Sequence, residues 1–378
     1  LFKGRPAMPE NASAERQWDY VLLLTVFLLV GIGLVMVLSA SSFLAEKDFG
    51  DAYFFFRPQL FYLLIGVALM LIVKNIPFQF FCRLSYFWLM LAVIGLILVF
   101  VPGIGHEAGG SSRWIKVGMF SGQPSEFAKF ALVVFLVRSM TAKRDRIKSF
   151  AYGLAPHLIV LGVLAGLVVF EPDLGTALTL VVVAMVMLFV GGVRFSYLLS
   201  LLGIIAPIAA FFVIRHGYQL KRISTFFTPW EDPLGAGYQI IHSFYAFALG
   251  GFTGVGPGAG MQKLTFLPEP HTDFIFAVVG EELGFIGAAA VTFLFLCLIW
   301  RGIVIALNAY ELEGTYLALG LTTLIGVQAF INMYVVTGLL PTKGLALPFL
   351  SSGGSSLIMN FVCVGIIMNV ASQRKRQG

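Results

Sequence analysis

The chain reads Lys263-Leu-Thr-Phe-Leu-Pro-Glu-Pro-His-Thr-Asp-Phe-Ile-Phe-Ala-Val-Val-Gly-Glu-Glu-Leu-Gly-Phe285 where a long apolar run begins. Only 12% of all residues are charged, so this stretch is unusual in gathering Glu269, His271, Asp273, Glu281 and Glu282. Ionisable groups at the edge of hydrocarbon are costly, and proteins keep them mostly where they perform chemistry or carry ions. The stretch therefore predicts a functional site at the mouth of a membrane-spanning helix.

The composition excludes an ordinary soluble domain. Of 378 residues, 58% are hydrophobic, and the mean hydropathy is +0.91. Runs of about 20 apolar residues span a bilayer, and in lipid each span must satisfy its own backbone groups, so the spans are helices. We predict an all-α integral membrane protein, one polytopic domain over residues 1–378. About ten spans are expected near 20–43, 58–76, 79–101, 124–141, 150–170, 174–192, 195–214, 272–300, 314–338 and 350–372.

The basic residues set the orientation. The net charge is +6, but Lys and Arg lie in short loops between apolar runs, which indicates membrane topology rather than nucleic-acid binding. Most of them, including Lys143, Arg144, Arg146 and Lys148, fall on the side of the N-terminus. We therefore expect both termini in the cytoplasm and an extracytoplasmic loop at about 215–271 between spans 7 and 8. Within that loop, 238–249 is apolar but too short to span, which favours a re-entrant or interfacial helix.

Cysteines and the first apolar run complete this picture. Cys82, Cys297 and Cys363 all lie inside apolar runs, so we expect buried thiols without disulfides or metal-binding spacing. The first run starts near Tyr20 and lacks a cleavage pattern, so it is expected to remain as an anchor.

Asp273 has two interpretations. It can be a carboxylate at a helix N-terminus that interacts with the helix dipole, or a general base in an outward cavity, where reduced hydration raises its pKa. His271 can assist it or simply satisfy a loop hydrogen bond. Glu269, between Pro268 and Pro270, is held on a stiff loop that suits a structural or cation-holding role.

The segment Pro124-Ser-Glu-Phe-Ala-Lys129 begins another span. Glu126 and Lys129 are three residues apart and therefore share a helix face. They can form an intrahelical ion pair that makes burial tolerable, or Lys129 can face an anionic ligand.

A tight turn, Glu171-Pro-Asp-Leu-Gly-Thr176, carries two carboxylates on the outer side. Asp173 can cap the following helix, or Glu171 and Asp173 can hold a divalent cation. The sequence favours the capping role.

Two other outer segments carry candidate ligand contacts. Trp114 lies between Arg113 and Lys116, an arrangement that suits an interfacial aromatic belt or a sugar–phosphate ligand. Residues 338–356 form a Gly/Ser-rich re-entry into the last span, which includes Ser351 and Ser355. Non-helical backbone at this depth requires protein or a water-filled cavity around it, so we expect it to line the same cavity as Asp273.

The glycine-rich run at 250–260 resembles a phosphate loop only superficially. It lacks the Lys-Ser/Thr ending and a preceding strand, so no nucleotide is expected there.

Taken together, these motifs resemble the SEDS family of peptidoglycan polymerases. They occur in family order over essentially the whole chain. The segment Pro341-Thr-Lys-Gly344, together with Gly353-Gly-Ser-Ser356, resembles the division branch (FtsW) more than the elongation branch (RodA). The motifs are Arg113-Trp-Ile115, Pro124-Ser-Glu126 with Lys129, Glu171-Pro-Asp-Leu-Gly-Thr176, Phe266-Leu-Pro-Glu-Pro-His-Thr-Asp-Phe-Ile-Phe276 and Gly353-Gly-Ser-Ser356.

The resemblance implies an inverting glycosyltransferase of the bacterial inner membrane that polymerises lipid II into glycan strands during cell division. It implies that Asp273 is the catalytic carboxylate and that Trp114 is required for activity. The diphosphate leaving group needs positive charge, for which Lys129, Arg113, Arg222 and Lys343, or a divalent cation such as Mg²⁺ or Mn²⁺, are candidates. A class B penicillin-binding protein transpeptidase and other division proteins are the implied partners.

Two rival functions belong to other classes. A lipid II flippase would need a polar path to the inner face, but the charges of the inner half lie mainly in loops. A non-enzymatic scaffold for cell-wall assembly would explain the spans but not the outer group of Glu, His, Asp, Trp and Lys residues.

Overall fold

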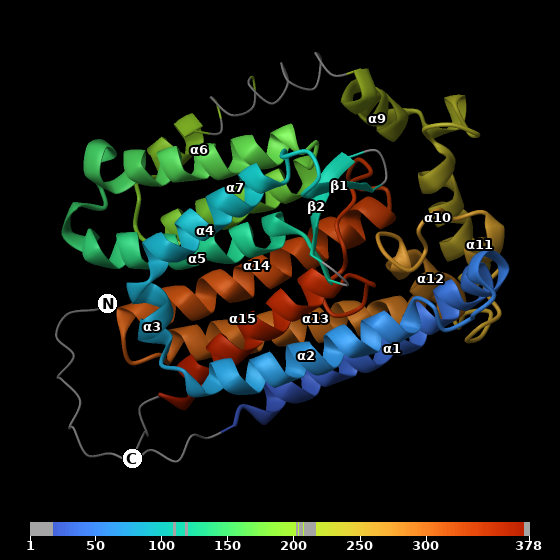
Figure 1. Cartoon of the computed structure of the whole chain (residues 1–378), viewed down its shortest axis with the longest axis horizontal. Helices are drawn as coiled ribbons and strands as arrows, with labels where there is room; N and C mark the ends of the chain where they lie inside the picture. Colours follow the sequence, from blue (N-terminus) through green and yellow to red (C-terminus); the bar gives the residue numbers. More distant parts are fainter. Residues whose placement is uncertain are drawn as a thin grey trace.

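The computed structural model describes residues 18–108, 111–117, 120–201, 203, 207 and 217–373. Within them, long helices lie roughly side by side, with a small sheet and several short helices gathered at one end (Figure 1). The long helices and their short extensions are α1 (Tyr20–Phe49), α2 (Phe56–Asn75), α3 (Phe78–Arg83), α4 (Ser85–Leu98), α5 (Pro124–Ala142), η2 (Phe150–Leu154), α6 (Ala155–Phe170), α7 (Leu174–Val190), α13 (Gly284–Leu307), α14 (Leu312–Val336) and α15 (Gly354–Ser372). The elements at the end of the bundle are β1 (Gly105–Ala108), β2 (Ser111–Val117), β3 (Phe120–Gly122), α9 (Gly217–Phe227), η3 (Pro229–Glu231), α10 (Tyr238–Gly250), α11 (Gln262–Thr265) and α12 (Ile275–Glu282).

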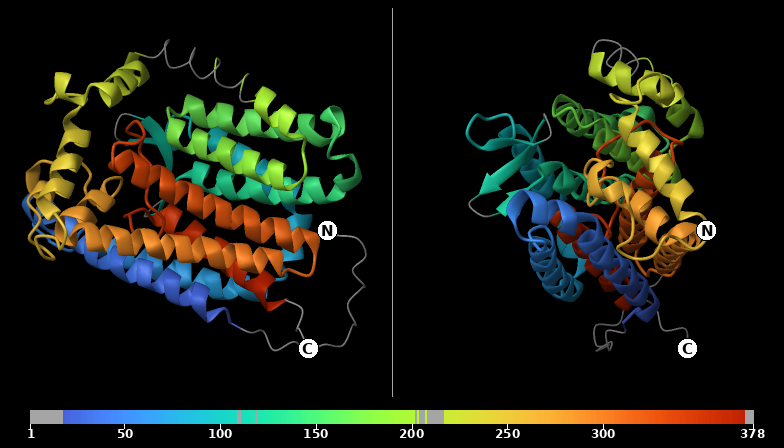
Figure 2. Two further views of the ribbon diagram at one scale, coloured as in Figure 1. Left: turned by 180° about the vertical axis from the view of Figure 1, so that it is seen from behind. Right: turned by 90° about the vertical axis from the view of Figure 1, so that its right-hand side faces the viewer.

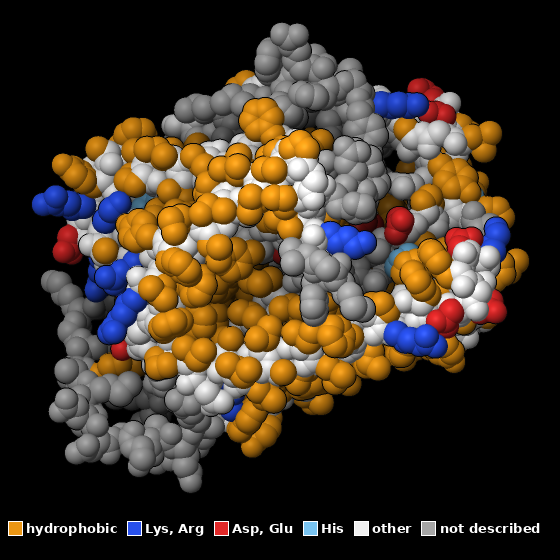
Figure 3. All heavy atoms as spheres, in the orientation of Figure 1, with side chains coloured by type: hydrophobic (Ala, Val, Ile, Leu, Met, Phe, Trp, Pro, Cys, Tyr) orange, Lys and Arg blue, Asp and Glu red, His pale blue; other side chains and the backbone are white. Residues whose placement is uncertain are grey.

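The integral membrane character is confirmed. Six helices of the described chain are long and apolar enough to cross a bilayer, namely α1, α2, η2 with α6, α13, α14 and α15. Hydrophobic side chains cover the flank of the bundle, while charged side chains gather toward its two ends (Figure 3). That distribution matches a hydrocarbon belt between two aqueous faces.

The predicted count of ten spans stays a prediction. Helices α4 and α7 are apolar but shorter than the six, and α5 carries three charges, Glu126, Lys129 and Arg138. Helices α3 and α4 divide the predicted third span at Leu84. The predicted seventh span, 195–214, is helical at 195–201, and most of its remainder lies outside the described residues.

Among the six long apolar helices, α14 and α15 are the most buried. The apolar part of α14 is 72% buried and that of α15 is 67% buried, against 28% for α2 at the periphery. Seen from behind, α14 runs between α13 and α7 (Figure 2). Helix α1 begins and α15 ends at the same end of the bundle, opposite the sheet (Figure 1). The expected cytoplasmic placement of both termini stays a prediction.

The predicted eighth span, 272–300, is not one helix. A short helix α12 ends at Glu282, and α13 begins at Gly284, whose φ of +66° lies in the left-handed region. Backbone from a distant loop replaces the missing helical hydrogen bonds, because Phe285 donates to Gly251 and Ile286 donates to Phe252. The expectation that Asp273 lies in the first turn of a long span was therefore wrong. It lies in the loop that precedes α12.

A small antiparallel sheet replaces the loop expected between spans 3 and 4. Its order is β1-β2-β3, with Gly105 opposite Ile115 and Ile115 opposite Gly122. The short helix expected at 238–249 is confirmed as α10, which has 13 residues and packs against α12. Sheet and short helices together cover one end of the bundle, where the candidate site lies.

Candidate functional site

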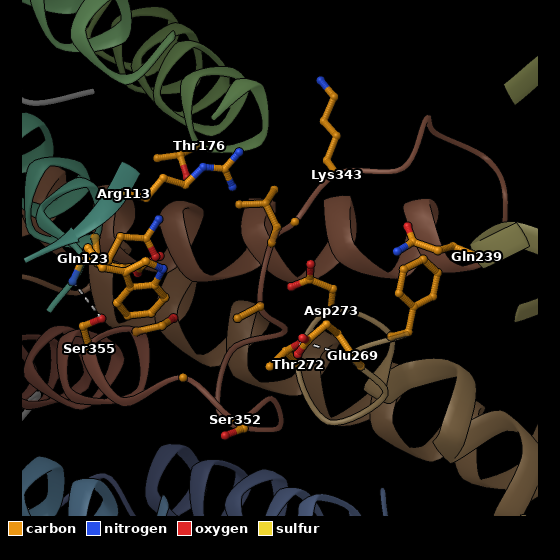
Figure 4. Close-up of a pocket in the computed structure, with 18 of the residues that line it drawn as sticks. Arg113, Gln123, Thr176, Gln239, Glu269, Thr272, Asp273, Lys343, Ser352 and Ser355 are labelled. Carbon is orange, nitrogen blue, oxygen red and sulfur yellow. Dashed lines mark hydrogen bonds between the residues drawn. The ribbon is translucent and has the colours of Figure 1, made fainter. Parts of the chain in front are cut away.

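A cavity of about 370 Å³ opens among the elements that cover this end of the bundle (Figure 4). The first turns of α5, α7, α10 and α15 reach it, so four helix N-termini with positive partial charge meet at one space. Helix N-termini favour anions such as phosphate groups. The lining residues are Arg113, Trp114, Gln123, Glu126, Thr176, Arg222, Gln239, Glu269, Thr272, Asp273, Phe274, Lys343, Gly344, Leu345, Ala346, Ser352, Gly353, Ser355 and Ser356.

The predicted re-entry at 338–356 lines the same cavity as Asp273, which confirms that expectation. Gly344 lies between a carboxylate and a cation. A Cβ atom added there would lie 3.0 Å from Asp273 Oδ2 and 3.7 Å from Arg113 Nη1. An added Cβ atom at 344 would therefore crowd the Asp273 carboxylate, while the approach to Arg113 is an ordinary contact.

The loop that carries Asp273 is joined to the re-entry by hydrogen bonds. Ser351 Oγ donates to the Thr272 carbonyl at 2.6 Å, and the Ser352 amide donates to the His271 carbonyl at 2.8 Å. Asn332 on α14 donates to the carbonyls of both segments, at 2.8 Å to Asp273 and 2.6 Å to Leu345. These bonds fix the backbone of the loop and leave the Asp273 side chain facing the cavity.

The Asp273 carboxylate is suited to exchange a proton near neutral pH. Burial in the cavity wall, together with the negative charges of Glu269 and Asp173, raises its pKa to about 7, against the opposing effect of Arg113 and Arg222. No group among the described residues donates a hydrogen bond to this carboxylate, and part of its surface remains open to the cavity. It can therefore accept a proton from a bound hydroxyl group.

Cationic side chains border the same space. Arg113 donates through Nε to the Glu171 carbonyl at 3.2 Å and through Nη2 to the Pro172 carbonyl at 2.6 Å. Arg222 Nη1 donates to the Thr342 carbonyl at 3.1 Å. Backbone carbonyls thus help to position both guanidinium groups at the cavity.

Lys343 and Trp114 complete the border of the cavity. The Lys343 amine points away from Asp273 (Figure 4), and burial lowers the pKa of Lys343. Trp114 neighbours Arg113 on β2, and its ring lines the cavity wall. An aromatic face beside cationic groups matches a sugar–phosphate ligand.

The structure distinguishes the two interpretations of Glu126 and Lys129. Lys129 Nζ donates to Glu126 Oε1 at 2.8 Å and to Gln328 Oε1 at 2.7 Å, and Lys129 is 2% exposed. Glu126 lines the cavity, whereas Lys129 does not. The intrahelical ion pair is therefore present, and the contact between Lys129 and an anionic ligand has no support in this geometry.

Asp173 caps α7, as the sequence favoured. It accepts hydrogen bonds from the Thr176 amide at 3.0 Å and the Thr176 hydroxyl at 2.8 Å, and Gln123 Nε2 donates to it at 3.3 Å. Glu171 is fully buried behind Arg113, and neither of its carboxylate oxygens has a partner within the described chain. Burial and the charge of Asp173 raise the pKa of Glu171 to about 8. Asp173 therefore caps a helix, whereas Glu171 is a buried carboxyl group with a raised pKa.

The other predicted residues of the opening stretch separate into two groups. Glu269 adopts a left-handed φ of +49° and exposes its side chain at the cavity rim. His271 is buried against Phe55, with ring centroids 4.5 Å apart, and burial lowers its pKa. Thus Glu269 borders the cavity and His271 supports the loop from behind.

The two predicted serines also differ in their placement. Ser351 points to the backbone rather than to the cavity, because its hydroxyl donates to the Thr272 carbonyl and accepts from the Leu347 amide. Ser355 lines the cavity, and its hydroxyl oxygen accepts a hydrogen bond from the backbone amide of Gln123 at 3.3 Å.

Sequence reasoning missed the amides of the site. Gln123 and Gln239 line the cavity, while Gln328 and Asn332 hold it from α14. The last two lie four residues apart in a 25-residue apolar helix. Polar residues inside a membrane helix generally face the bundle interior, so this spacing was a usable signal.

Metal binding has limited support from the protein alone. Across the described ranges, no three His, Cys, Asp or Glu side chains gather as potential metal ligands. The divalent cation expected from the resemblance stays a prediction.

Comparison with known proteins identifies the family. The family model for FtsW, RodA and SpoVE, described as "Cell cycle protein", matches residues 20–376. The "Probable peptidoglycan glycosyltransferase FtsW" of Trichlorobacter lovleyi is 46% identical over 359 residues, which cover 95% of this chain and 94% of that protein. "Stage V sporulation protein E" of Bacillus subtilis is 43% identical over 355 residues, with coverage of 93% and 96%.

Solved structures share the fold over nearly the full length. A chain in the structure titled "Structural coordination of polymerization and crosslinking by a peptidoglycan synthase complex" superposes with a TM-score of 0.78 at 28% identity, covering 95% of this chain and 99% of that one. The crystal structure of the Thermus thermophilus rod shape determining protein RodA gives a TM-score of 0.70 at 25% identity, with coverage of 98% and 100%. Sequence and fold thus agree over almost every residue, and the chain belongs to the FtsW/RodA/SpoVE family of cell cycle proteins.

Proposed function

We propose that this protein is a peptidoglycan glycosyltransferase that polymerises lipid II at the outer face of the bacterial cytoplasmic membrane during cell division. The observation that carries the proposal is the Asp273 carboxylate, which faces a cavity bordered by Arg113, Arg222 and Trp114. Burial raises the pKa of Asp273 to about 7, which suits a base at physiological pH. The relatives named as probable peptidoglycan glycosyltransferases support the same assignment.

The chemistry requires one base and one stabilised leaving group. The 4-hydroxyl oxygen of the acceptor sugar attacks C1 of the donor sugar while Asp273 takes the hydroxyl proton. The bond from C1 to the phosphate oxygen breaks, and its electron pair leaves with undecaprenyl diphosphate. Attack from the face opposite the leaving group inverts the configuration at C1. A protonated Asp273 can then return its proton to water.

Fixed positive charge suits the departing diphosphate. Arg113 and Arg222 are held by backbone carbonyls, so their charges need little reorganisation during the reaction. The N-termini of α5, α7, α10 and α15 add partial positive charge. Trp114 offers a flat face to a sugar ring. A divalent cation stays a prediction, and no step above depends on one.

The arrangement of charge supports cytoplasmic termini. Helix α5 begins at Pro124, reaches the cavity through Glu126 in its first turn and ends at Ala142. The basic segment 143–148 therefore lies at the opposite end of the bundle. Basic loops remain on the cytoplasmic side of membrane proteins, which would place the cavity outside. A class B penicillin-binding protein is the partner we propose, since one similar chain comes from a structure described as a peptidoglycan synthase complex.

Purified wild-type protein supplied with lipid II, alone and with the partner transpeptidase, tests the proposal. Wild type should form glycan polymer, and Asp273→Ala should lose most of this activity. Asp51→Ala is a matched control, since Asp51 is an outer carboxylate that pairs with Arg57 away from the cavity. Polymer from Asp273→Ala at wild-type yield would exclude Asp273 as the base. Absence of polymer from the wild-type complex, with lipid II transport in vesicles, would favour the flippase.

A further inference from the structure

The glycine-rich run at 250–260 packs against the C-terminal end of α12. The Val255 and Gly256 amides donate to the carbonyls of Glu281 and Glu282, both at 3.0 Å. A Cβ atom at Gly254 would lie only 2.1 Å from the Glu282 carbonyl oxygen, and Gly254 has a φ of +82°. Glycine is therefore required for this contact between loop and helix.

The side chains of Glu281 and Glu282 fasten this loop. Glu281 Oε1 accepts from the amides of Met261 at 2.6 Å and Gln262 at 3.1 Å. Glu282 Oε2 accepts from the Gly258 amide at 2.9 Å. Both carboxylates are at most 1% exposed, so each has exchanged water for a defined set of protein donors.

Glu282 also joins this end of α12 to α1. Lys263 Nζ donates to Glu282 Oε1 at 2.5 Å and to Ser39 Oγ at 2.7 Å. Ser39, on α1, in turn donates to Glu282 Oε1 at 2.7 Å. We call Ser39, Lys263 and Glu282 the α12 anchor. It brings together three segments that are distant in sequence.

Helix α12 links the anchor to the cavity. It has eight residues, so it is about 12 Å long, and Asp273 lies two residues before it. None of the three anchor residues lines the cavity. At the cavity end, the loop that carries Asp273 is hydrogen-bonded to Asn332 and to the re-entry at 338–356. At the other end, the α12 anchor holds the last residue of α12.

We propose that the α12 anchor is a positioning device for Asp273, holding α12 so that the carboxylate faces the bound acceptor hydroxyl. The proposal rests on the proposed glycosyltransferase function. A buried ion pair is weak evidence for stability, because apolar residues of similar size often stabilise as well. Hydrogen bonds that join three segments instead fix the position of α12 relative to α1. Displacement of a reacting group by about 1 Å can lower a rate about 100-fold.

The chain offers a matched control pair. Arg301 on α13 and Asp19 at the start of α1 form an ion pair at 2.9 Å, at the end of α1 far from the cavity. The Lys263–Glu282 pair holds α1 to α12 through Ser39, and the Arg301–Asp19 pair holds the start of α1 to α13. The double variants Lys263→Met with Glu282→Gln, and Arg301→Met with Asp19→Asn, remove one pair each without leaving an unpaired charge.

The experiment compares polymerisation kinetics and thermal midpoints of both double variants with those of wild type. The proposal predicts that loss of the α12 anchor lowers kcat at least about tenfold at unchanged KM for lipid II, whereas loss of the control pair leaves kcat within about twofold. Should the anchor double variant fail to fold, Ser39→Ala and Ser39→Thr replace it. Ala should then lower kcat, and Thr, which keeps the hydroxyl, should restore it.

The proposal is wrong if kcat of the anchor variant matches that of the control variant, or if only KM rises. Equal kcat for Ser39→Ala and wild type would contradict it as well. Failure of wild type and the control variant to polymerise lipid II would instead overturn the proposed function, so the two failures are distinguishable.

Discussion

Replacing Asp273 by Asn tests the proposed base, because the side chain keeps its shape but cannot ionise. Asp has an ordinary pKa of 3.8, and burial beside Glu269 raises the pKa of Asp273 to about 7. This difference corresponds to a cost of about 4 kcal/mol for the ionised form, an upper value because the carboxylate partly faces the cavity. Both the activity and the stability of the protein should therefore depend on pH through this group.

Activity should rise with pH, because only ionised Asp273 accepts a proton. With a pKa of about 7, the ionised fraction grows about tenfold between pH 6 and pH 8, and the rate should follow it. Stability should change in the opposite sense. The folded state holds a proton that the unfolded state loses above about pH 4, so the stabilisation from protonated Asp273 is lost as pH rises to about 7. Asp273→Asn should remove this part of the pH dependence.

The assay is the initial rate of glycan formation from lipid II across the pH range, with thermal midpoints measured in parallel. Glu269→Gln gives a directional check, because the negative charge of Glu269 raises the pKa of Asp273. Without it, the rising limb of the rate profile should move to lower pH. A wild-type rate that is flat between pH 6 and pH 8 would refute the reasoning. So would a limb near pH 7 that persists in the residual activity of Asp273→Asn.

Three further predictions concern other parts of the site. Trp114→Ala should raise KM for lipid II about tenfold or more while Trp114→Phe keeps most of the affinity, as steady-state kinetics would reveal. Asn332→Leu should lower kcat and destabilise by about 2–6 kcal/mol, because the carbonyls of Asp273 and Leu345 lose their donor; kinetics and chemical denaturation report the two effects. Lys129→Met should destabilise by about 3–5 kcal/mol by leaving Glu126 unpaired, and adding Glu126→Gln should recover much of that loss in the same denaturation assay.

The spans were predictable because hydropathy depends on composition and length alone. The sequence also indicated that the re-entry at 338–356 and Asp273 share a cavity, since irregular backbone needs such surroundings inside a membrane. The sheet at 105–122 was missed because its short strands carry polar residues without a clear alternation. The break at Gly284 was missed because the loop backbone that replaces the helical hydrogen bonds begins more than 30 residues earlier in the chain.

The carboxylates of the opening stretch show why the site itself was harder to predict than the spans. In sequence, Glu281 and Glu282 are as costly within an apolar run as Asp273 is. In the structure, Glu281 and Glu282 have complete sets of donors, supplied from residues 258–263 and from Ser39, more than 240 positions away. At Asp273 it is the backbone carbonyl that accepts a hydrogen bond, from Asn332. Within the described residues its carboxylate accepts none. A carboxylate whose donors are supplied by the fold serves structure, whereas one left to face a cavity is available to a substrate. Only the folded chain distinguishes the two, since the donors are remote in sequence.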